Sequence, residues 1–139
     1  MGLKTRDIRR WVAEMANYFG IQQWFRKKTC DLSGGQKQLL NLASIMVMQP
    51  KILILDEPTS QLDPIAAVEF ITTLQKVNQE LGLTIVLVEH RLEEVYALAD
   101  RVIVMEDGKV IYDDSPQMVA QQLKKQKQGH PMVCVLRGS

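Results

Sequence analysis

The sequence is poor in the residues that define several specialised classes of protein. Among its 139 residues there are only two cysteines, Cys30 and Cys134, far apart in the chain and outside any C-x-x-C pair. This pattern indicates neither a disulfide framework nor a cysteine-ligated metal site, and favours unpaired thiols in a reducing compartment. No apolar run approaches the roughly 18 residues that span a bilayer, and no signal peptide opens the chain. A membrane partner would therefore have to be another chain.

An excess of one charge is also missing. The formal net charge is +1, so a general affinity for nucleic acid or for an anionic membrane is not expected. Aromatic residues make up only 6% of the chain, and Trp11 and Trp24 are more simply interpreted as packing residues than as base-stacking ones. With 46% hydrophobic and 24% charged residues, the composition predicts a globular chain of single-domain size with a buried core.

The first ordered segment is an amphipathic helix over residues 4–19. Apolar residues recur there at helical spacing, with basic residues between them, which predicts one buried face. Gly20 is expected to end the helix. The apolar positions are Ile8, Trp11, Val12, Met15, Ala16 and Phe19.

The stretch Leu32–Gln36 carries the first chemical signal. Ser33 is a good N-cap for a helix from Gly34 to Met48, which is apolar on nearly every face and is therefore expected to be buried. A helix that begins here presents backbone N–H groups, and Gly34 and Gly35 let a phosphate approach them closely. Taken alone, an ordinary capped helix after a Gly-Gly turn explains this stretch equally well.

A short apolar run, Ile52–Leu55, follows the helix-breaking Gln49-Pro50 pair. Bounded in this way it predicts a strand buried on both faces, as in a parallel sheet. Asp56 and Glu57 come directly after it, at the carboxyl end of the strand, where open α/β sheets place their ligand sites. Two carboxylates leaving a buried strand need partners, so a purely structural explanation is weak.

A strand–helix–strand unit continues from this point. The next helix is expected from Pro64, with Asp63 as a possible N-cap, to about Glu80. A second buried strand over residues 84–88 follows and ends in the polar run Glu89–Arg91. The short connections predict a parallel, right-handed βαβ unit.

The chain then changes character to a hairpin. Residues 101–105 and 109–112 are rich in β-branched residues and flank Asp107-Gly108, a pair typical of a two-residue hairpin turn.

Two further helices are expected, over residues 92–98 and from Pro116 to about residue 125. The Gln- and Lys-rich run over residues 121–128 is interpreted as a solvated helix face rather than a binding patch. Residues 130–139 receive no assignment.

Four motifs in this order resemble the C-terminal half of an ABC nucleotide-binding domain over residues 32–112. Leu32–Gln36 resembles the signature motif, Ile52–Glu57 the Walker B motif, and Ser60–Asp63 the D-loop, while His90 falls where the switch histidine is expected. The runs LSGGQKQ, DEPTSQLDP and VEHRLEEV are most similar to ATPase subunits of energy-coupling factor importers of the vitamin or cobalt class.

The resemblance implies an α/β fold: a partial P-loop NTPase (RecA-like) core with parallel strands, a C-terminal β-hairpin and part of the ABC helical subdomain. Residues 1–48 would end the helical subdomain, 49–115 would form the C-terminal half of the ATPase core, and 116–139 a C-terminal helix and tail.

The resemblance also assigns roles at the carboxyl end of the first strand. Asp56 would hold Mg²⁺, Glu57 would act as general base toward the water that attacks the γ-phosphoryl group of ATP, and His90 would contact that phosphate and water.

The remaining implied site residues serve a two-subunit site. Those at the signature motif are Ser33, Gly34, Gly35 and Gln36. Ser33, Gly35 and Gln36 would contact the γ-phosphate bound to the opposite ATPase subunit, in a homo- or heterodimer, and Asp63 would lie near the dimer seam. The resemblance further implies a membrane-embedded partner subunit and a position at the inner, cytoplasmic face of the cell membrane, with no nucleic acid partner.

A Walker A motif, G-x-x-x-x-G-K-[ST], does not occur in the 139 residues. The expectation is therefore a fragment that alone neither binds ATP tightly nor hydrolyses it, with an uncovered sheet edge that promotes self-association. Two alternatives remain open: a soluble ABC ATPase of translation or DNA repair, and a non-catalytic chain that donates only its signature motif to a partner's site.

Overall fold

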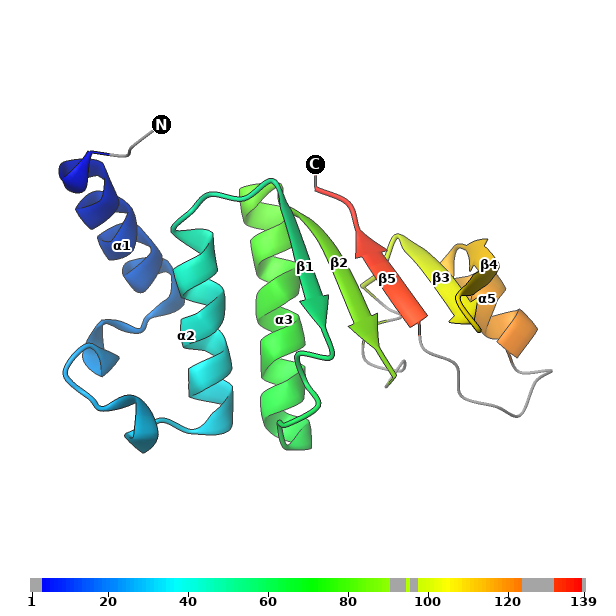
Figure 1. Cartoon of the computed structure of the whole chain (residues 1–139), viewed down its shortest axis with the longest axis horizontal. Coiled ribbons are helices and arrows are strands. Elements are labelled where there is room, and N and C mark those ends of the chain that lie inside the picture. Colours follow the sequence, from blue (N-terminus) through cyan, green and yellow to red (C-terminus); the bar gives the residue numbers. More distant parts are fainter. Residues whose placement is uncertain (1–3, 91–94, 96–97, 124–131, 139) are drawn as a thin grey trace. The chain divides into compact units, whose positions relative to one another are not determined.

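The computed structural model describes residues 4–90, 95, 98–123 and 132–138. The chain divides into two compact units, Met1–Pro50 and Lys51–Ser139. The first unit is helical, and Figure 1 shows it in blue and cyan. Its elements are α1 (Thr5–Phe19), the 3₁₀ turns η1 (Gln22–Trp24) and η2 (Thr29–Asp31), and α2 (Gly34–Met46).

Helix α1 ends where the sequence predicts. Gly20 adopts φ 66°, in the left-handed region that glycine enters without strain, and the N–H of Ile21 donates to the carbonyl of Ala16 at 3.0 Å. The turn brings Ile21 back onto the helix, where it forms a buried apolar cluster with Ala16 and Ala43 of α2. Trp24 packs against this cluster, which confirms that it is a packing residue.

Helix α2 is less buried than its composition predicts. It ends at Met46, and only Leu42, Ala43 and Met46 are buried along it. Lys37, Asn41 and Ser44 recur at helical spacing and are exposed. They form a polar stripe along one side of a helix whose composition is otherwise mostly apolar. The expectation of burial on nearly every face is therefore wrong.

The second unit is a five-stranded sheet with helices, in the strand order β1-β2-β5-β3-β4 (Figure 1). β1 and β2 are parallel, and every other neighbouring pair is antiparallel. The helix expected over residues 92–98 falls largely outside the described residues, as does most of the run over 121–128. The elements are β1 (Ile52–Asp56), α3 (Pro64–Leu81), β2 (Thr84–Glu89), β3 (Arg101–Glu106), β4 (Lys109–Asp114), α5 (Pro116–Leu123) and β5 (Met132–Leu136).

Helix α3 is capped at both ends, and its Asp63-Pro64 start is the predicted one. Asp63 Oδ1 accepts hydrogen bonds from the N–H groups of Ile65 and Ala66 at 3.0 Å, Pro64 is the first helical residue, and Gly82 closes the helix at φ 64°. The helix lies along β1 and β2 (Figure 1). Its buried residues are Ala67, Phe70, Ile71, Leu74, Val77 and Asn78.

Strand β1 is buried on one face rather than on both. Leu53 is 4% exposed, whereas Ile52 and Ile54 are 60% and 70% exposed. Side chains alternate between the two faces of a strand, and among the described elements none covers the face of Ile52 and Ile54. β1 is also an edge strand, with β2 as its one neighbour in the described sheet. The expected strand is correct and its expected double burial is wrong.

Strand β5 lies inside the sheet, although residues 130–139 carry no assignment from the sequence. It pairs with β2 on one side, with Val135 opposite Val86, and with β3 on the other, with Cys134 opposite Val102. Burial, and then the nearby charge of Glu89, raise the pKa of the Cys134 thiol to about 11. A buried thiol with this pKa is a packing residue, and both cysteines are free, as the sequence predicts.

The residues after β5 are fixed against the end of α3. The buried Asn78 amide donates to the carbonyl oxygens of Leu83 at 2.8 Å and Arg137 at 3.1 Å. Gly138 lies so close to the backbone of Gly82 that a Cβ atom there would be 1.9 Å from the Gly82 carbonyl oxygen. Only glycine fits this approach without movement of the backbone.

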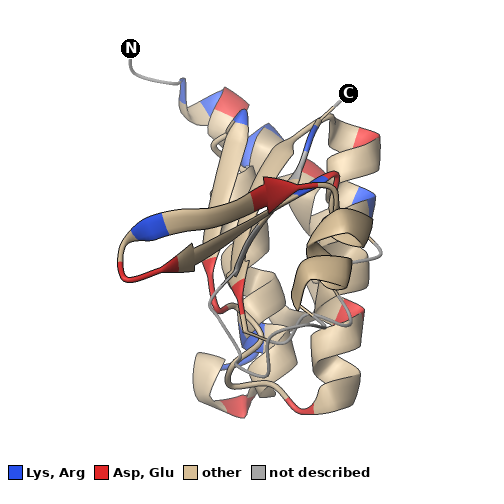
Figure 2. Ribbon diagram, turned by 90° about the vertical axis from the view of Figure 1, so that its right-hand side faces the viewer, with Lys and Arg blue, Asp and Glu red and all other residues tan. Residues whose placement is uncertain are grey.

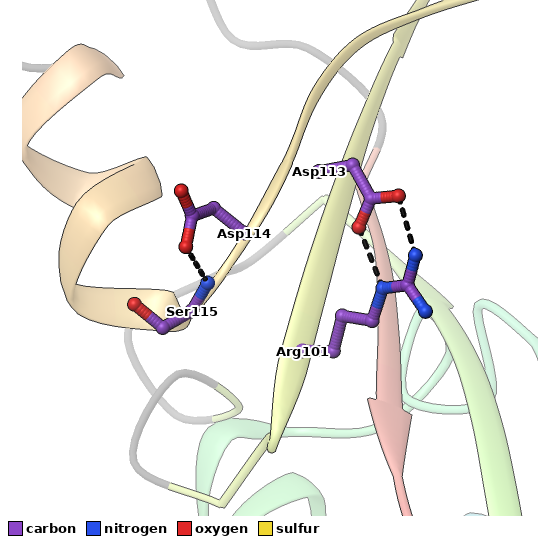
Figure 3. Close-up of polar contacts among 4 residues, drawn as sticks. All are labelled: Arg101, Asp113, Asp114 and Ser115. Atoms are coloured by element: carbon purple, nitrogen blue, oxygen red, sulfur yellow. Dashed lines mark hydrogen bonds and ion pairs between the residues drawn. The ribbon is translucent and has the colours of Figure 1, made fainter.

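The hairpin of β3 and β4 forms as predicted. Asp107 and Gly108 have φ 48° and 74°, the positive values that a two-residue primed turn requires. Figure 2 shows residues of both charge signs at its tip. Near the base of the hairpin, Arg101 Nε and Nη2 donate to the two carboxylate oxygens of Asp113, each at 2.6 Å (Figure 3). The N–H of Ser115 donates to Asp114 Oδ1 at 2.7 Å immediately before α5 (Figure 3).

The Arg101–Asp113 pair predicts a pH dependence of stability. The hydrogen bonds from Arg101 hold the pKa of Asp113 below its ordinary value of 3.8. A carboxyl whose pKa is lower in the folded state stabilises the fold above its unfolded pKa, and this contribution is lost as the pH falls through the folded value. We expect Asp113→Asn to lower Tm slightly at pH 7, because the pair is on the surface, and to lower it less as the pH falls below 3.8.

Thermal unfolding of wild type and Asp113→Asn between pH 7 and pH 3 measures this effect. The control is Arg101→Met, in whose background Asp113→Asn should lose its pH-dependent effect. A Tm difference that is constant across this range would contradict the prediction.

Candidate functional site

The carboxyl ends of β1 and β2 bring two of the predicted site residues into contact. His90 Nε2 lies 2.7 Å from Glu57 Oε1, and the side chains are 55% and 42% exposed. Glu57 follows β1 and His90 follows β2, and parallel strands end at the same edge of the sheet. The N–H of Glu57 donates to the carbonyl of Val88 at 2.8 Å, so the β1–β2 ladder continues one residue beyond β1. The pair is accessible to a ligand and held by the sheet.

Glu57 adopts an unusual backbone conformation. Its φ is 44°, in the left-handed region that non-glycine residues rarely occupy. The chain turns immediately afterwards, with the N–H of Ser60 donating to the Glu57 carbonyl at 3.1 Å. Strained residues of this kind persist where the surrounding contacts fix them, and they concentrate at functional sites.

Asp56, the predicted metal ligand, is the last residue of β1 and is exposed. It precedes Glu57 in the chain and pairs in register with Val88 of β2. In the part of the chain that the structure describes, no group of three or more His, Cys, Asp or Glu side chains could hold a metal ion. Asp56 therefore offers one exposed carboxylate at the carboxyl end of β1, next to that of Glu57.

The signature-like stretch forms the capped helix start that the sequence predicts. The N–H of Gln36 donates to Ser33 Oγ at 3.2 Å, and the N–H of Ser33 donates to Gln36 Oε1 at 3.0 Å, which is a complete capping box. Gly34 is exposed and Gly35 is half-buried, so no bulky side chain covers the first turn of α2. These residues belong to the first unit. Asp63 belongs to the second, and its side chain caps α3.

Two buried polar residues beside the site were not singled out from the sequence. Glu89 is 3% exposed, and its Oε1 accepts hydrogen bonds from the hydroxyl of Thr59 at 2.7 Å and from the Thr59 N–H at 3.2 Å. Thr59 is equally buried. The burial of Glu89 could have been predicted from the two-residue alternation along β2. Glu89 follows Ile85 and Leu87 on the face of the strand that points inward.

Residues 3–60 match the family model described as ABC transporter. A putative ABC transporter ATP-binding protein of Bacillus thuringiensis subsp. konkukian is 50% identical over 133 residues, which is 96% of this chain and 24% of the relative. Energy-coupling factor transporter ATP-binding protein EcfA1 of Caldanaerobacter subterraneus subsp. tengcongensis is 42% identical over 124 residues, 89% of this chain and 44% of the relative.

Solved structures agree with these relatives. The structure of cbiO1 from Clostridium perfringens, described as part of the ABC transporter complex cbiONQ, superposes with a TM-score of 0.79 at 35% identity. The match covers 91% of this chain and 53% of that one.

The fold is thus that of part of a P-loop NTPase domain, with a mixed α/β sheet. The chain is similar to ABC transporter ATP-binding proteins, and energy-coupling factor ATPases are among the relatives it matches. It spans less than half of the length of the curated relatives it matches, 24% and 44% in the two above.

None of the described helices is both long and apolar enough to cross a membrane.

Proposed function

We propose that this chain is part of the ATPase subunit of an energy-coupling factor type ABC importer, of the vitamin or cobalt class. Glu57 and His90 would belong to its ATP-hydrolysis site. The observation that carries the proposal is the contact between Glu57 and His90 at the carboxyl ends of two parallel strands, 2.7 Å apart and open to solvent. Ligand sites of open α/β sheets lie at this edge. The similarity to EcfA1 and to cbiO1 supports the importer class.

In this proposal Glu57 accepts a proton from, or orients, the water that attacks the γ-phosphoryl group of ATP. His90 fixes the Glu57 carboxylate through their contact and donates toward the γ-phosphate and the water. The solvent exposure of both side chains leaves room for a triphosphate to reach them.

Asp56 would hold Mg²⁺, which would neutralise charge on the phosphate oxygens. Mg²⁺ usually keeps several waters and takes only one or two protein carboxylates together with substrate phosphates. One exposed carboxylate, with no further cluster of acidic or histidine ligands among the described residues, fits that donor set.

The first unit would act on a second copy of the site. Ser33, Gly35 and Gln36, with Gly34 leaving the helix start clear, would contact the γ-phosphate bound to the opposite ATPase subunit. The capping box supports this role because it fixes the first turn of α2 and its N–H groups. Asp63 would lie at the seam between the subunits. The membrane-embedded partner is proposed by analogy with cbiO1, whose complex is cbiONQ.

The test compares ATP turnover by the 139-residue chain with turnover by a longer protein, called the full-length protein below, in which the same residues are joined to a Walker A half. We expect turnover by the full-length protein and none by the chain alone, because its sequence contains no P-loop to hold the β- and γ-phosphates. Turnover by the purified chain that is abolished in Glu57→Gln would contradict the expectation for the chain. A full-length protein without ATPase activity would contradict the proposed function.

A further inference from the structure

We propose that Glu89 is a positioning residue for ATP turnover, acting through Thr59 on the Glu57 carboxylate. The inference deepens the proposed ATPase function and rests on it. Both side chains are 3% exposed, and the Glu89 carboxylate accepts two hydrogen bonds from Thr59, one from its hydroxyl and one from its backbone N–H. Glu89 is adjacent to His90, and Thr59 lies two residues beyond Glu57.

The two hydrogen bonds hold the chain at Thr59, two residues after Glu57. The Glu57 N–H is already bound to the carbonyl of Val88 in β2. The strained Glu57 backbone is therefore held between two anchors, and both anchors come from consecutive residues of β2. Because His90 is the next residue of the same strand end, Glu57 and His90 are both positioned relative to β2.

The loop after Thr59 has its own local bonds, which would not place Glu57 by themselves. The N–H of Ser60 donates to the Glu57 carbonyl, and the N–H of Leu62 donates to the Thr59 carbonyl at 3.0 Å. These bonds define turns within the loop but do not tie it to the sheet. The Glu89–Thr59 contact joins it to β2.

A buried carboxylate is a costly way to hold a loop. Burial of a charged or polar group is unfavourable unless hydrogen bonds compensate it, and an apolar residue would pack beside Leu87 at less cost. Cys134 of β5 is near enough for the charge of Glu89 to contribute to the raised pKa of its thiol. The carboxylate therefore offers directional bonds to Thr59 that an apolar residue could not provide, at the point where orientation matters for Glu57.

The experiment measures kcat and KM for ATP in the full-length protein with three variants. Thr59→Val removes the hydroxyl and keeps the shape, and we expect kcat to fall about 10- to 100-fold with KM within about twofold, since misplacement of a reacting group by an ångström costs up to that much. Thr59→Ser restores the hydroxyl and should restore most of kcat. Thr72→Val, the same change at an exposed threonine of α3, is the matched control and should leave kcat unchanged.

A second readout uses the 139-residue chain itself. The imidazole signals of His90 in NMR spectra report its contact with Glu57, as Glu57→Gln will show by shifting them. We expect Thr59→Val to shift them as well, and Thr59→Ser and Thr72→Val to leave them in place. If Thr59→Val does not fold, Glu89→Gln, which keeps an acceptor oxygen but loses the charge, should give a smaller change in the same direction.

The outcomes separate the two proposals. An inactive wild-type full-length protein overturns the ATPase function, while the His90 signals still test the positioning. An active wild type in which Thr59→Val matches Thr72→Val in kcat and in the His90 signals overturns the role of Glu89 and leaves the ATPase function standing.

Discussion

Replacing Glu57 by glutamine lowers kcat for ATP in the full-length protein by about 100- to 10,000-fold, the range expected when a general base is removed. Glutamine keeps the length and the hydrogen-bonding oxygen that faces His90, but it cannot take a proton from water. The binding of ATP should change little, because the substitution leaves the phosphate-binding groups in place. Steady-state turnover and nucleotide binding, measured on the same preparation, separate the two effects.

The matched control is Glu69→Gln, which makes the same change of charge on the exposed side of α3. It should leave kcat within about twofold of wild type, since a substitution of an exposed residue outside the core and the candidate site has little effect on the fold. A Glu57→Gln protein with wild-type kcat would instead favour the non-catalytic alternative, in which the chain contributes only Ser33–Gln36 to a partner's site.

The second large effect concerns self-association of the 139-residue chain. Strand β1 is a sheet edge, and unpaired strand edges promote association with other chains. Ile52 and Ile54 project from its uncovered face. In an antiparallel pair of β1 strands centred on Leu53, Ile52 of one copy lies opposite Ile54 of the partner subunit, so that four isoleucines meet on one face. The chain should therefore form concentration-dependent dimers or larger species.

Ile54→Lys should weaken this association by about 100-fold or more, because each dimer loses two isoleucines worth about 1.5–3 kcal/mol apiece and gains charges along the edge. Sedimentation velocity over a series of concentrations measures the effect. The control is Ile65→Lys, which changes a 73% exposed isoleucine in the first turn of α3 and should leave the association intact. A wild-type chain that stays monomeric at high concentration contradicts the prediction.

The features that the sequence predicted well depend on local chemistry. The Asp107-Gly108 turn, the Asp63-Pro64 start of α3 and the capping box at Ser33 each follow from residues within a few positions of one another. The contact between Glu57 and His90 was also foreseeable, because both follow apolar strands of one βαβ unit and parallel strands end together. The resemblance to ABC domains also assigns these two residues to a single site, around the γ-phosphate of ATP.

The features that the sequence did not predict depend on distant partners. Residues 132–136 lie inside the sheet only because β2 and β3 each leave an edge for them, and no local pattern states this. The burial of β1 was overestimated because Ile52 and Ile54 need a covering element that the described residues do not contain. Glu89 was missed because its acceptor role depends on Thr59, thirty residues earlier in the chain.

The position of β5 has a consequence for biogenesis. Strand β5 lies between β2 and the β3–β4 hairpin, with its Val135 opposite Val86 of β2. The ribosome synthesises β5 about forty residues after β2. Until β5 leaves the ribosome, one edge of β2 is unpaired and β3 lacks the strand that joins the hairpin to the rest of the sheet. Contacts between such distant residues form slowly and expose nascent segments to aggregation. The described sheet is therefore complete only after residues 132–136 have been synthesised, and until then β2 exposes an unpaired edge that can associate with other chains.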